Sequence, residues 1–465
     1  MSHEISRRTF LAGAPGVAVA PRPVNVLFVL ADSWRSTAFS GCGDPLVSTP
    51  NFSRFAEQGV RFTRMYATNP LCTPNRSCIL TGRFSFQNRM IYNNIMLPPD
   101  ERSFVETFSA SGYATHYIGK WHMDGADKPG YVPRGWRRRG FQTFEGFNRG
   151  HYYPTGAQYF TDDGKLARPK VYEPVYQTDL AIDFMKRNRA RPFFCFLSWG
   201  PPHGPYRVPK EWDRYDPAKL EWRANVPREV RDDPDVRANL AGYYGSCTAL
   251  DHEFGRLMKA LDEEGLAANT LVAFTSDHGD MHGSHAAFGK SKPEEESLHI
   301  PLYMRLPGRI RAKQAVHTLA SSIDLAPTIL SICARKPLPH ASGRDLSAAV
   351  LGGPQPKVES VYAEGELRAT LGRRKKADED EGGGVTAGME WRCVVTPTHK
   401  LAVRHDGKVA GLFDLEKDPL EMKNLAGERS HTALQKHLLE RLERWGRETG
   451  DPFPNPAEAA QSSYA

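Results

Sequence analysis

The sequence predicts a layered α/β fold, with a mostly parallel sheet between helices and a smaller α+β subdomain at the C-terminal end. Residues 24–31 are a near-continuous apolar run, which is typical of a central strand buried on both faces of a parallel sheet. Helical segments and apolar strands alternate from there to about residue 350. After that point the pattern changes to short strands separated by turn residues, followed by one helix.

In the first part of the chain, helix signals and apolar runs indicate the elements one by one. Thr49 and Pro50 are start signals for the helix that follows them. Pro192 interrupts a later helix, because proline cannot continue one, and an apolar strand follows directly. The predicted helices are residues 51–58, 103–111 and 177–188, and the predicted strands are residues 24–31, 113–118 and 193–198.

The second part of the chain continues the same alternation. A long helix is predicted over residues 235–264, and the strand predicted at 269–276 has an apolar centre. A strand at 301–305 and a helix at 324–332 follow. We expect residues 23–354 to form the larger domain.

Residues 355–465 are predicted to form the smaller subdomain. A charged stretch at 371–384 lacks periodicity and ends in glycines, which is typical of a flexible loop. Asp406-Gly407 is a typical hairpin turn between two short antiparallel strands. The expected elements are strands at 391–395, 400–404 and 409–414 and a helix at 432–449.

Length and composition limit the class of protein. At 465 residues, 40% of them hydrophobic, the chain can bury a large core. The net charge of +7 is modest and the basic residues are scattered, so we expect no nucleic-acid partner. One basic cluster is predicted to be a solvated loop, namely Arg134, Arg137, Arg138 and Arg139. Seven cysteines form no disulfide framework, and their odd number leaves at least one unpaired.

Residues 1–22 have the pattern of an export signal. Arg7 and Arg8 form a twin-arginine motif, and a short run of small apolar residues ends in Ala18-Val19-Ala20, like a cleavage site. The run is too short to span a bilayer, and no other stretch is predicted to span one. The alternative is an ordinary basic tail. An export signal of this kind implies a bacterial source and a periplasmic or secreted protein.

The segment around Cys72 has the pattern of a turn that leads into a helix. Pro74 suits a first helical turn, and Gly82 can take the left-handed conformation that ends a helix. Cys72 is therefore expected just before a helix N-terminus, where the dipole and the exposed N–H groups favour an anion. Arg76 can reach the same end. The alternative is a small buried cysteine without chemistry, which is common for this residue type.

Two of the predicted strands lead into acidic residues. Asp32 follows the strand at 24–31, and Asp277-His278 follows the strand at 269–276. Carboxylates at the ends of strands in one sheet can converge on a divalent cation, and His278 would add a nitrogen ligand. The alternative for each aspartate is an ordinary helix N-cap.

Lysine and histidine side chains occur in the loops beyond the predicted strands. Each of them alone is more often a surface or structural residue. Together, around a metal, they suit the transfer of an anionic group, because cations offset its charge and an imidazole can protonate the leaving oxygen. These residues are Lys120, His122, His203 and Lys290.

The motifs resemble those of the type I sulfatases. Every fixed position of the family signature is present, namely Cys72, Pro74, Arg76, Thr81, Gly82 and Arg83. Gly-Lys-Trp-His, Pro-Pro-His, Ser-Asp-His-Gly-Asp and the closing Leu-Phe-Asp-Leu-Glu-Lys-Asp-Pro follow in the family order. The resemblance covers about residues 24–430 and implies an alkaline phosphatase-like fold, with a large mixed, mostly parallel sheet between helices.

The resemblance also implies a cofactor. In this family a maturation enzyme oxidises the cysteine to formylglycine, whose hydrated aldehyde is the nucleophile. Cys72 would be that residue, with Arg76 and Lys120 steadying the hydrate. The implied metal is calcium, with manganese or magnesium as alternatives. Its implied ligands are Asp32, Asp277, His278 and the modified Cys72.

Further roles follow from the same resemblance. The sulfate oxygens would be bound by Lys120, His203 and Lys290. His203 would also be the acid that protonates the leaving oxygen, and His122 would be the base that helps the sulfated intermediate release sulfate.

At one position the chain departs from the pattern of many family members. Ser33 stands where they have a second aspartate after the first strand. Choline sulfatases and phosphonate monoester hydrolases also replace that aspartate. Loss of a carboxylate makes the site less negative and brings manganese or magnesium into consideration. The departure also supports an alternative function, a phosphonate monoester hydrolase or phosphodiesterase.

The leading hypothesis is an exported sulfatase that acts on an aryl sulfate or a sulfated carbohydrate. A loop at about 124–177 is rich in aromatic residues and arginine, which favours a carbohydrate because aromatic faces stack on sugars and arginine pairs with acidic groups. A hypothesis of another class is a binding protein for sulfated glycans without activity. It would leave Cys72 unmodified.

Overall fold

The computed structural model describes residues 22–44, 46–151, 153, 156–365, 390–451 and 453. Apart from its last residue, the predicted export signal at 1–22 lies outside the described residues. The predicted loop at 371–384 lies outside them as well. All seven cysteines are described, and none forms a disulfide.

The described residues form a ten-stranded mixed sheet in the order β12-β2-β11-β9-β1-β8-β4-β5-β6-β7. Only β11 and β6 of these described strands run against the direction of β1, so the predicted mostly parallel sheet is confirmed. The strands are β1 (Asn25–Asp32), β2 (Val60–Phe62), β4 (Ala114–Lys120), β5 (Thr143–Phe147), β6 (Tyr159–Phe160), β7 (Leu166–Ala167), β8 (Phe193–Pro202), β9 (Thr270–Ser276), β11 (Leu302–Arg305) and β12 (Gln314–Val316).

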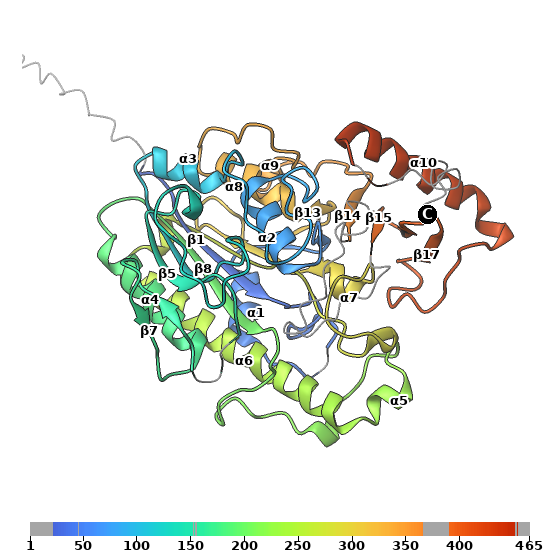
Figure 1. Ribbon diagram of the computed structural model, residues 1–465, viewed down its shortest axis with the longest axis horizontal. Helices are drawn as coiled ribbons and strands as arrows, with labels where there is room; N and C mark the ends of the chain where they lie inside the picture. The colour runs from blue at the N-terminus through green and yellow to red at the C-terminus, as the bar shows by residue number, and fades with distance from the viewer. Residues whose placement is uncertain are drawn as a thin grey trace, which may run out of the picture.

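Helices cover both faces of this sheet (Figure 1). All eight residues of β1 are buried, and their side chains alternate between two apolar cores. Phe28 packs in the core under α2, α3, α8 and α9, and Val29 packs in the core under α1, α4 and α6. These helices are α1 (Pro50–Glu57), α2 (Cys72–Thr81), α3 (Phe104–Ala110), α4 (Glu173–Arg187), α6 (Pro234–Glu263), α8 (Leu325–Ile332) and α9 (Ser347–Val350).

A small antiparallel sheet and a helix lie at one end of the molecule (Figure 1). The predicted hairpin turn is confirmed, with Gly407 at a positive φ of 76° between β16 and β17. The strand β14 was not predicted. The elements are β14 (Val361–Glu364), β15 (Trp391–Val395), β16 (His399–Arg404), β17 (Val409–Asp414) and α10 (Thr432–Thr449).

The core of this end is continuous with the rest of the protein. Val394, Leu412 and Leu442 pack in one cluster with Cys78 of α2 and with Phe84. The division into domains at about residue 355 therefore stays a prediction. The remaining short elements are β3 (Met65–Tyr66), β10 (His299–Ile300) and β13 (Ala320–Ser321), which pair with one another, and helices α5 (Arg228–Arg231) and α7 (Glu295–Leu298).

The segment predicted as one loop at about 124–177 is more ordered than expected. It contains β5, β6 and β7, and α4 begins four residues before the predicted start at 177. The prediction that its basic cluster is a solvated loop is wrong for two of the four arginines. Arg138 is buried and pairs with Asp162, and Arg139 is buried and donates to backbone carbonyls, among them that of Glu101. Burial of a guanidinium requires such partners, which local sequence does not reveal.

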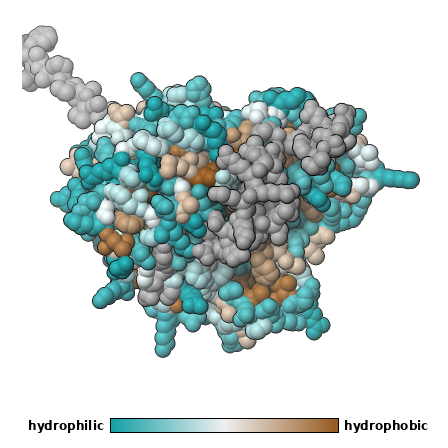
Figure 2. Space-filling model, viewed as in Figure 1, coloured by the Kyte–Doolittle hydropathy of each residue, from teal (hydrophilic) through white to brown (hydrophobic). Residues whose placement is uncertain are grey.

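The face seen in Figure 2 is covered mainly by hydrophilic residues, with small scattered apolar groups. Among the helices of the described residues, none is both long and apolar enough to cross a membrane.

Candidate active site

Four neighbouring parallel strands deliver polar side chains to one edge of the sheet. Asp32 is the last residue of β1, and Asp277 directly follows β9. Lys120 is the last residue of β4, and His203 directly follows β8. Since β9, β1, β8 and β4 are adjacent and parallel, their carboxyl ends meet at the same place. The predicted shared edge is confirmed.

Helix α2 brings Cys72 to this edge. The sequence predicted Cys72 just before the helix, whereas Cys72 is the first helical residue. All ten residues of α2 are buried. Gly82 ends the helix in the left-handed conformation with φ 64°, as predicted. The N-terminus of a buried helix therefore faces the strand ends, and its free N–H groups favour negative charge there.

The side chains of Asp32, Cys72, Asp277 and His278 form a buried cluster whose ligand atoms all lie within 4.8 Å of one another. The Cys72 Sγ lies 3.3 Å from His278 Nε2 and 3.8 Å from Asp32 Oδ1. His278 Nδ1 lies 2.9 Å from the carbonyl oxygen of Gly279. That hydrogen bond assigns the proton to Nδ1 and leaves the Nε2 lone pair directed at the cluster, as in metal-binding histidines.

Arg76 binds both aspartates of the cluster. Its Nε donates to Asp277 Oδ2 over 3.0 Å and its Nη2 donates to Asp32 Oδ2 over 3.2 Å. Burial by itself would raise the pKa of Asp32, but Lys120 and the other nearby cations hold that pKa well below its usual value. Asp32 is therefore a carboxylate.

Two lysines lie beside the Cys72 sulfur, and an imidazole contacts one of them. Lys290 Nζ lies 3.0 Å from Cys72 Sγ, and Lys120 Nζ lies 3.7 Å from it. Lys120 also donates to Asp32 Oδ2 over 2.9 Å, and His203 Nε2 lies 2.9 Å from Lys290 Nζ. Burial and Lys290 lower the pKa of His203 to about 4, so its ring is neutral at pH 7 without a bound anion.

His122 is attached to the start of α2 through its backbone. Its carbonyl accepts from Thr73 Oγ1 over 2.6 Å, and its own φ is 59°. The ring Nε2 lies 2.9 Å from Asn94 Oδ1. The structure thus places His122 beside the N-terminus of the helix that carries Cys72, and its role as a base stays a prediction.

Ser33 donates to both aspartates of the cluster. Its backbone N–H donates to Asp277 Oδ1 and its hydroxyl donates to Asp32 Oδ1, each over 3.2 Å. The φ of Ser33 is 68°, a left-handed conformation that turns the chain sharply after β1. The serine that replaces the usual aspartate thus acts here as a hydrogen-bond donor to the carboxylates.

Residues 24–333 match the model of the family described as Sulfatase. The chain belongs to the sulfatase family. It is 30% identical to an ulvan-active sulfatase from Formosa agariphila over 93% of this chain and 83% of the relative. The family match confirms the resemblance, and the enzyme is a sulfuric ester hydrolase.

Other relatives and solved structures agree with this assignment. The sulfatase is 26% identical to an N-acetylglucosamine-6-O-sulfatase from Bacteroides thetaiotaomicron over 93% of this chain and 88% of the relative. A crystal structure of the yidJ protein from Bacteroides fragilis has a TM-score of 0.83 and 28% identity, covering 95% of this chain and 99% of that one. A phosphonate monoester hydrolase from Silicibacter pomeroyi shares the fold, at 22% identity and a TM-score of 0.74, covering 92% of this chain and 96% of that one.

Sequence analysis missed one residue beside the centre of this sulfatase. The ring of His151 stacks on that of His203, with centroids 3.8 Å apart and an interplanar angle of 1°. Its Nε2 lies 3.3 Å from Lys120 Nζ. His151 lies in an irregular segment after β5 and not at the end of a strand, so only the polar and aromatic composition of that segment pointed to it.

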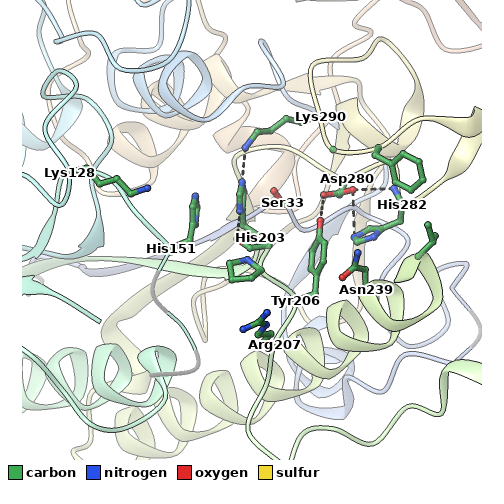
Figure 3. Close-up of a pocket in the computed structure, with 15 residues that line it drawn as sticks. Ser33, Lys128, His151, His203, Tyr206, Arg207, Asn239, Asp280, His282 and Lys290 are labelled. Carbon is green, nitrogen blue, oxygen red and sulfur yellow. Dashed lines mark hydrogen bonds and ion pairs between the residues drawn. The ribbon is translucent and has the colours of Figure 1, made fainter. Parts of the chain in front are cut away.

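A cavity of about 640 Å³ opens beside the cluster (Figure 3). Ser33, His151, His203 and Lys290 line it on the side of the strand ends. Its volume is in the range of ligand-binding sites in proteins, which is about 300–1,000 Å³. Substrate can therefore reach two of the predicted sulfate-binding residues, His203 and Lys290, from this cavity.

Proposed function

We propose that this sulfatase hydrolyses sulfate esters of carbohydrates, using a formylglycine made from Cys72 and a bound divalent cation. The observation that carries the proposal is the position of Cys72. Its sulfur lies within 4 Å of His278, Asp32, Lys120 and Lys290, inside a buried cluster. A cysteine kept only for packing would not need two lysines and two metal-type ligands around it.

The donor set fits a divalent cation. The ligand atoms of two buried carboxylates and the Nε2 of His278 lie within 4.8 Å of one another. Arg76 and Lys120 match the charge of the two carboxylates, so it is the converging oxygen and nitrogen donors, rather than a net negative charge, that suit a cation. A cation bound by Asp32, Asp277, His278 and the modified Cys72 would supply Lewis-acid chemistry. We propose calcium, with manganese or magnesium as alternatives because Ser33 leaves the site one carboxylate short.

The surroundings of Cys72 also fit the formylglycine. The aldehyde, once hydrated, supplies an oxygen nucleophile in place of the thiol. Arg76 and Lys120 would orient that group, since Arg76 fixes both aspartates and Lys120 lies between Asp32 and Cys72. Conversion of the cysteine requires a formylglycine-generating maturation enzyme, which we propose as a partner.

The chain's own cations would bind the sulfate and move the protons. Lys120, Lys290 and His203 would contact the sulfate oxygens, and the negative charge would raise the pKa of His203 from about 4. The protonated ring could then donate to the leaving oxygen. His122 would accept a proton when sulfate is released.

A carbohydrate substrate is supported by the cavity and by the relatives. The cavity has room for a sugar beyond the sulfate group. Phe288 at its edge is 51% exposed, and an exposed aromatic face can stack on a sugar ring. One relative is named for its activity on ulvan and another for N-acetylglucosamine 6-sulfate.

We also propose that residues 1–22 direct export and that residues 23–354 and 355–465 form two domains.

The phosphonate monoester hydrolase activity remains the second candidate, because Ser33 replaces an aspartate and such an enzyme shares the fold. Turnover of 4-nitrophenyl sulfate and 4-nitrophenyl phenylphosphonate by purified enzyme, matured at Cys72 and loaded with metal, separates the two. We expect the sulfate ester to have the higher kcat/KM. Dominant turnover of the phosphonate would reject sulfate esters as the main substrates.

A further inference from the structure

The cavity extends well beyond the residues that would hold the scissile sulfate. His203 and Lys290 line it together with Tyr206, Arg207 and Phe288. In Figure 3, Lys290 and Arg207 are on opposite sides of His203. A ligand that fills the cavity would therefore reach Arg207 with a part of the molecule other than the sulfate that is cleaved.

Among the described residues that line the cavity, cations outnumber acidic residues. Lys128, Arg207 and Lys290 face one acidic residue among the described residues that line the cavity, Asp280. Asp280 is already engaged, because its Oδ2 accepts from the Tyr206 hydroxyl over 2.9 Å and its Oδ1 accepts from the backbone N–H of His282. The sulfate monoester offers one negative charge, which the residues around Cys72 would take. A second anion on the substrate would complement the positive charge of Arg207 at the far side of the cavity.

Arg207 is the residue best placed to bind that anion. It is exposed, and its guanidinium makes no hydrogen bond or ion pair with any residue that the structure describes. Arg223 and Arg231 in the same region are instead tied to Glu296 and to backbone carbonyls. A guanidinium can bind a carboxylate or a sulfate through two parallel hydrogen bonds.

The backbone that carries Arg207 is held in place by helix α6. A Cβ atom on Gly242 of α6 would lie 2.0 Å from the carbonyl oxygen of Tyr206, so the two backbones are in close contact. The Tyr206 hydroxyl is held by Asp280, and the Arg207 N–H donates to the carbonyl of Pro205 over 2.8 Å. The backbone at Arg207 is thus set before a ligand arrives, so binding has to order only the side chain.

We infer that the substrate carries a second anionic group, a carboxylate or a further sulfate, and that Arg207 binds it. This inference rests on the proposed function. Arg207 is then a specificity-determining residue, and the preferred substrate is a glycan with two or more acidic groups. A guanidinium binds a carboxylate and a sulfate in the same way, and the choice of substrates in the experiment distinguishes these two anions.

The test compares kcat/KM of wild type, Arg207→Gln and Lys210→Gln on four substrates. Lys210 is an exposed cation on the same segment that does not line the cavity, so it controls for loss of one positive charge. The substrates are 4-nitrophenyl sulfate, N-acetylglucosamine 6-sulfate, glucosamine 2-N,6-O-disulfate and a 6-sulfated glucosamine disaccharide with a uronate. We expect wild type to prefer one or both of the doubly acidic sugars.

For those sugars, Arg207→Gln is expected to lower kcat/KM about ten- to a hundredfold, mainly through KM, as for the loss of a charge-assisted hydrogen bond. The singly acidic substrates should change less than about twofold, and Lys210→Gln should match wild type. Which sugar is affected identifies the anion as sulfate or carboxylate. Equal losses on all substrates, or no preference of wild type for a second acidic group, would overturn the inference. Failure of wild type to hydrolyse any sulfate ester would instead reject the proposed function.

Discussion

The side chain of Arg76 joins the two aspartates of a fully buried site. Its guanidinium binds one oxygen of Asp32 and one of Asp277, and it also donates to the Lys120 carbonyl and the Ser198 hydroxyl over 2.8 Å each. Removal of one partner from such a group leaves an uncompensated buried charge, which costs about 3–5 kcal/mol. Variants at this site should therefore keep the shape of the side chain that they replace.

Asp277→Asn tests the proposed metal site with little change in shape. The amide keeps one oxygen but loses the charge that would bind a cation, so we expect bound metal to fall and kcat/KM to drop by at least about a hundredfold. Elemental analysis and turnover of 4-nitrophenyl sulfate measure the two effects. Asp163→Asn, on an exposed loop, is the matched control. A variant that retains full metal content and activity would remove Asp277 from the ligand set.

His203→Asn tests the proposed acid through the leaving group. A sugar hydroxyl must gain a proton as it leaves, whereas 4-nitrophenolate leaves readily without one. We expect kcat on N-acetylglucosamine 6-sulfate to fall about 10²–10⁴-fold and kcat on 4-nitrophenyl sulfate to fall less than about tenfold. Equal losses on the two substrates would show that His203 only binds sulfate.

At the scale of elements, the strand ends of the site could be predicted from sequence. The buried runs that become β1 and β9 have local signals, and parallel strands in one sheet must end at the same edge. The length of β8 could not be predicted, because it reaches Pro202 through an irregular register against β1 that depends on the partner strand. His151 and strand β14 were missed for the same reason, since their places are decided by contacts distant in sequence.

Gly242→Ala tests the contact between α6 and the segment that carries Arg207. Alanine is the better helix former, but its Cβ would collide with the Tyr206 carbonyl, so we expect a loss of about 1–3 kcal/mol in unfolding free energy. Gly446→Ala in α10 has open space around it and should be neutral or gain about 0.5–1 kcal/mol. Denaturant unfolding measures both. Equal stability of the two variants would show that the α6 contact is not tight.

Glu364 of β14 makes the attachment of the small sheet sensitive to pH. Its Oε1 accepts from the backbone N–H of Ser85, which follows α2, over 2.6 Å. Burial raises the pKa of Glu364 to about 7, although Arg392 opposes the shift. The folded state therefore binds more protons than the unfolded state between pH 4.5 and 7, and stability falls as pH rises through that window.

Glu364→Gln should remove this dependence. We expect the variant to match wild type near pH 5 and to exceed its unfolding free energy by about 2–3 kcal/mol at pH 8, as the shift in pKa requires. Urea unfolding at the two pH values gives the comparison. The prediction is wrong if the stability difference between variant and wild type is the same at both.

At the scale of the whole molecule, the fold separates support from chemistry. Two apolar cores on the faces of the ten-stranded sheet, within the described residues, fix four parallel strands whose ends carry the charged cluster. Helix α2 crosses to that edge with Cys72 at its first residue, and the small C-terminal sheet packs against the same region through Cys78. Composition and motifs predicted this arrangement because each part has a local signal. The cavity and the place of Arg207 in its lining have none, since they exist only after α6 and the loops are packed.

The most direct test of the account is the mass of the tryptic peptide at residues 65–76, from active enzyme produced together with a maturation enzyme. We predict a peptide lighter by the difference between a thiol and an aldehyde at Cys72, which an aldehyde reagent traps. Activity should rise in proportion to the fraction converted. Active enzyme with an intact thiol at Cys72 would contradict the account, because the proposed nucleophile would then be absent from a working site.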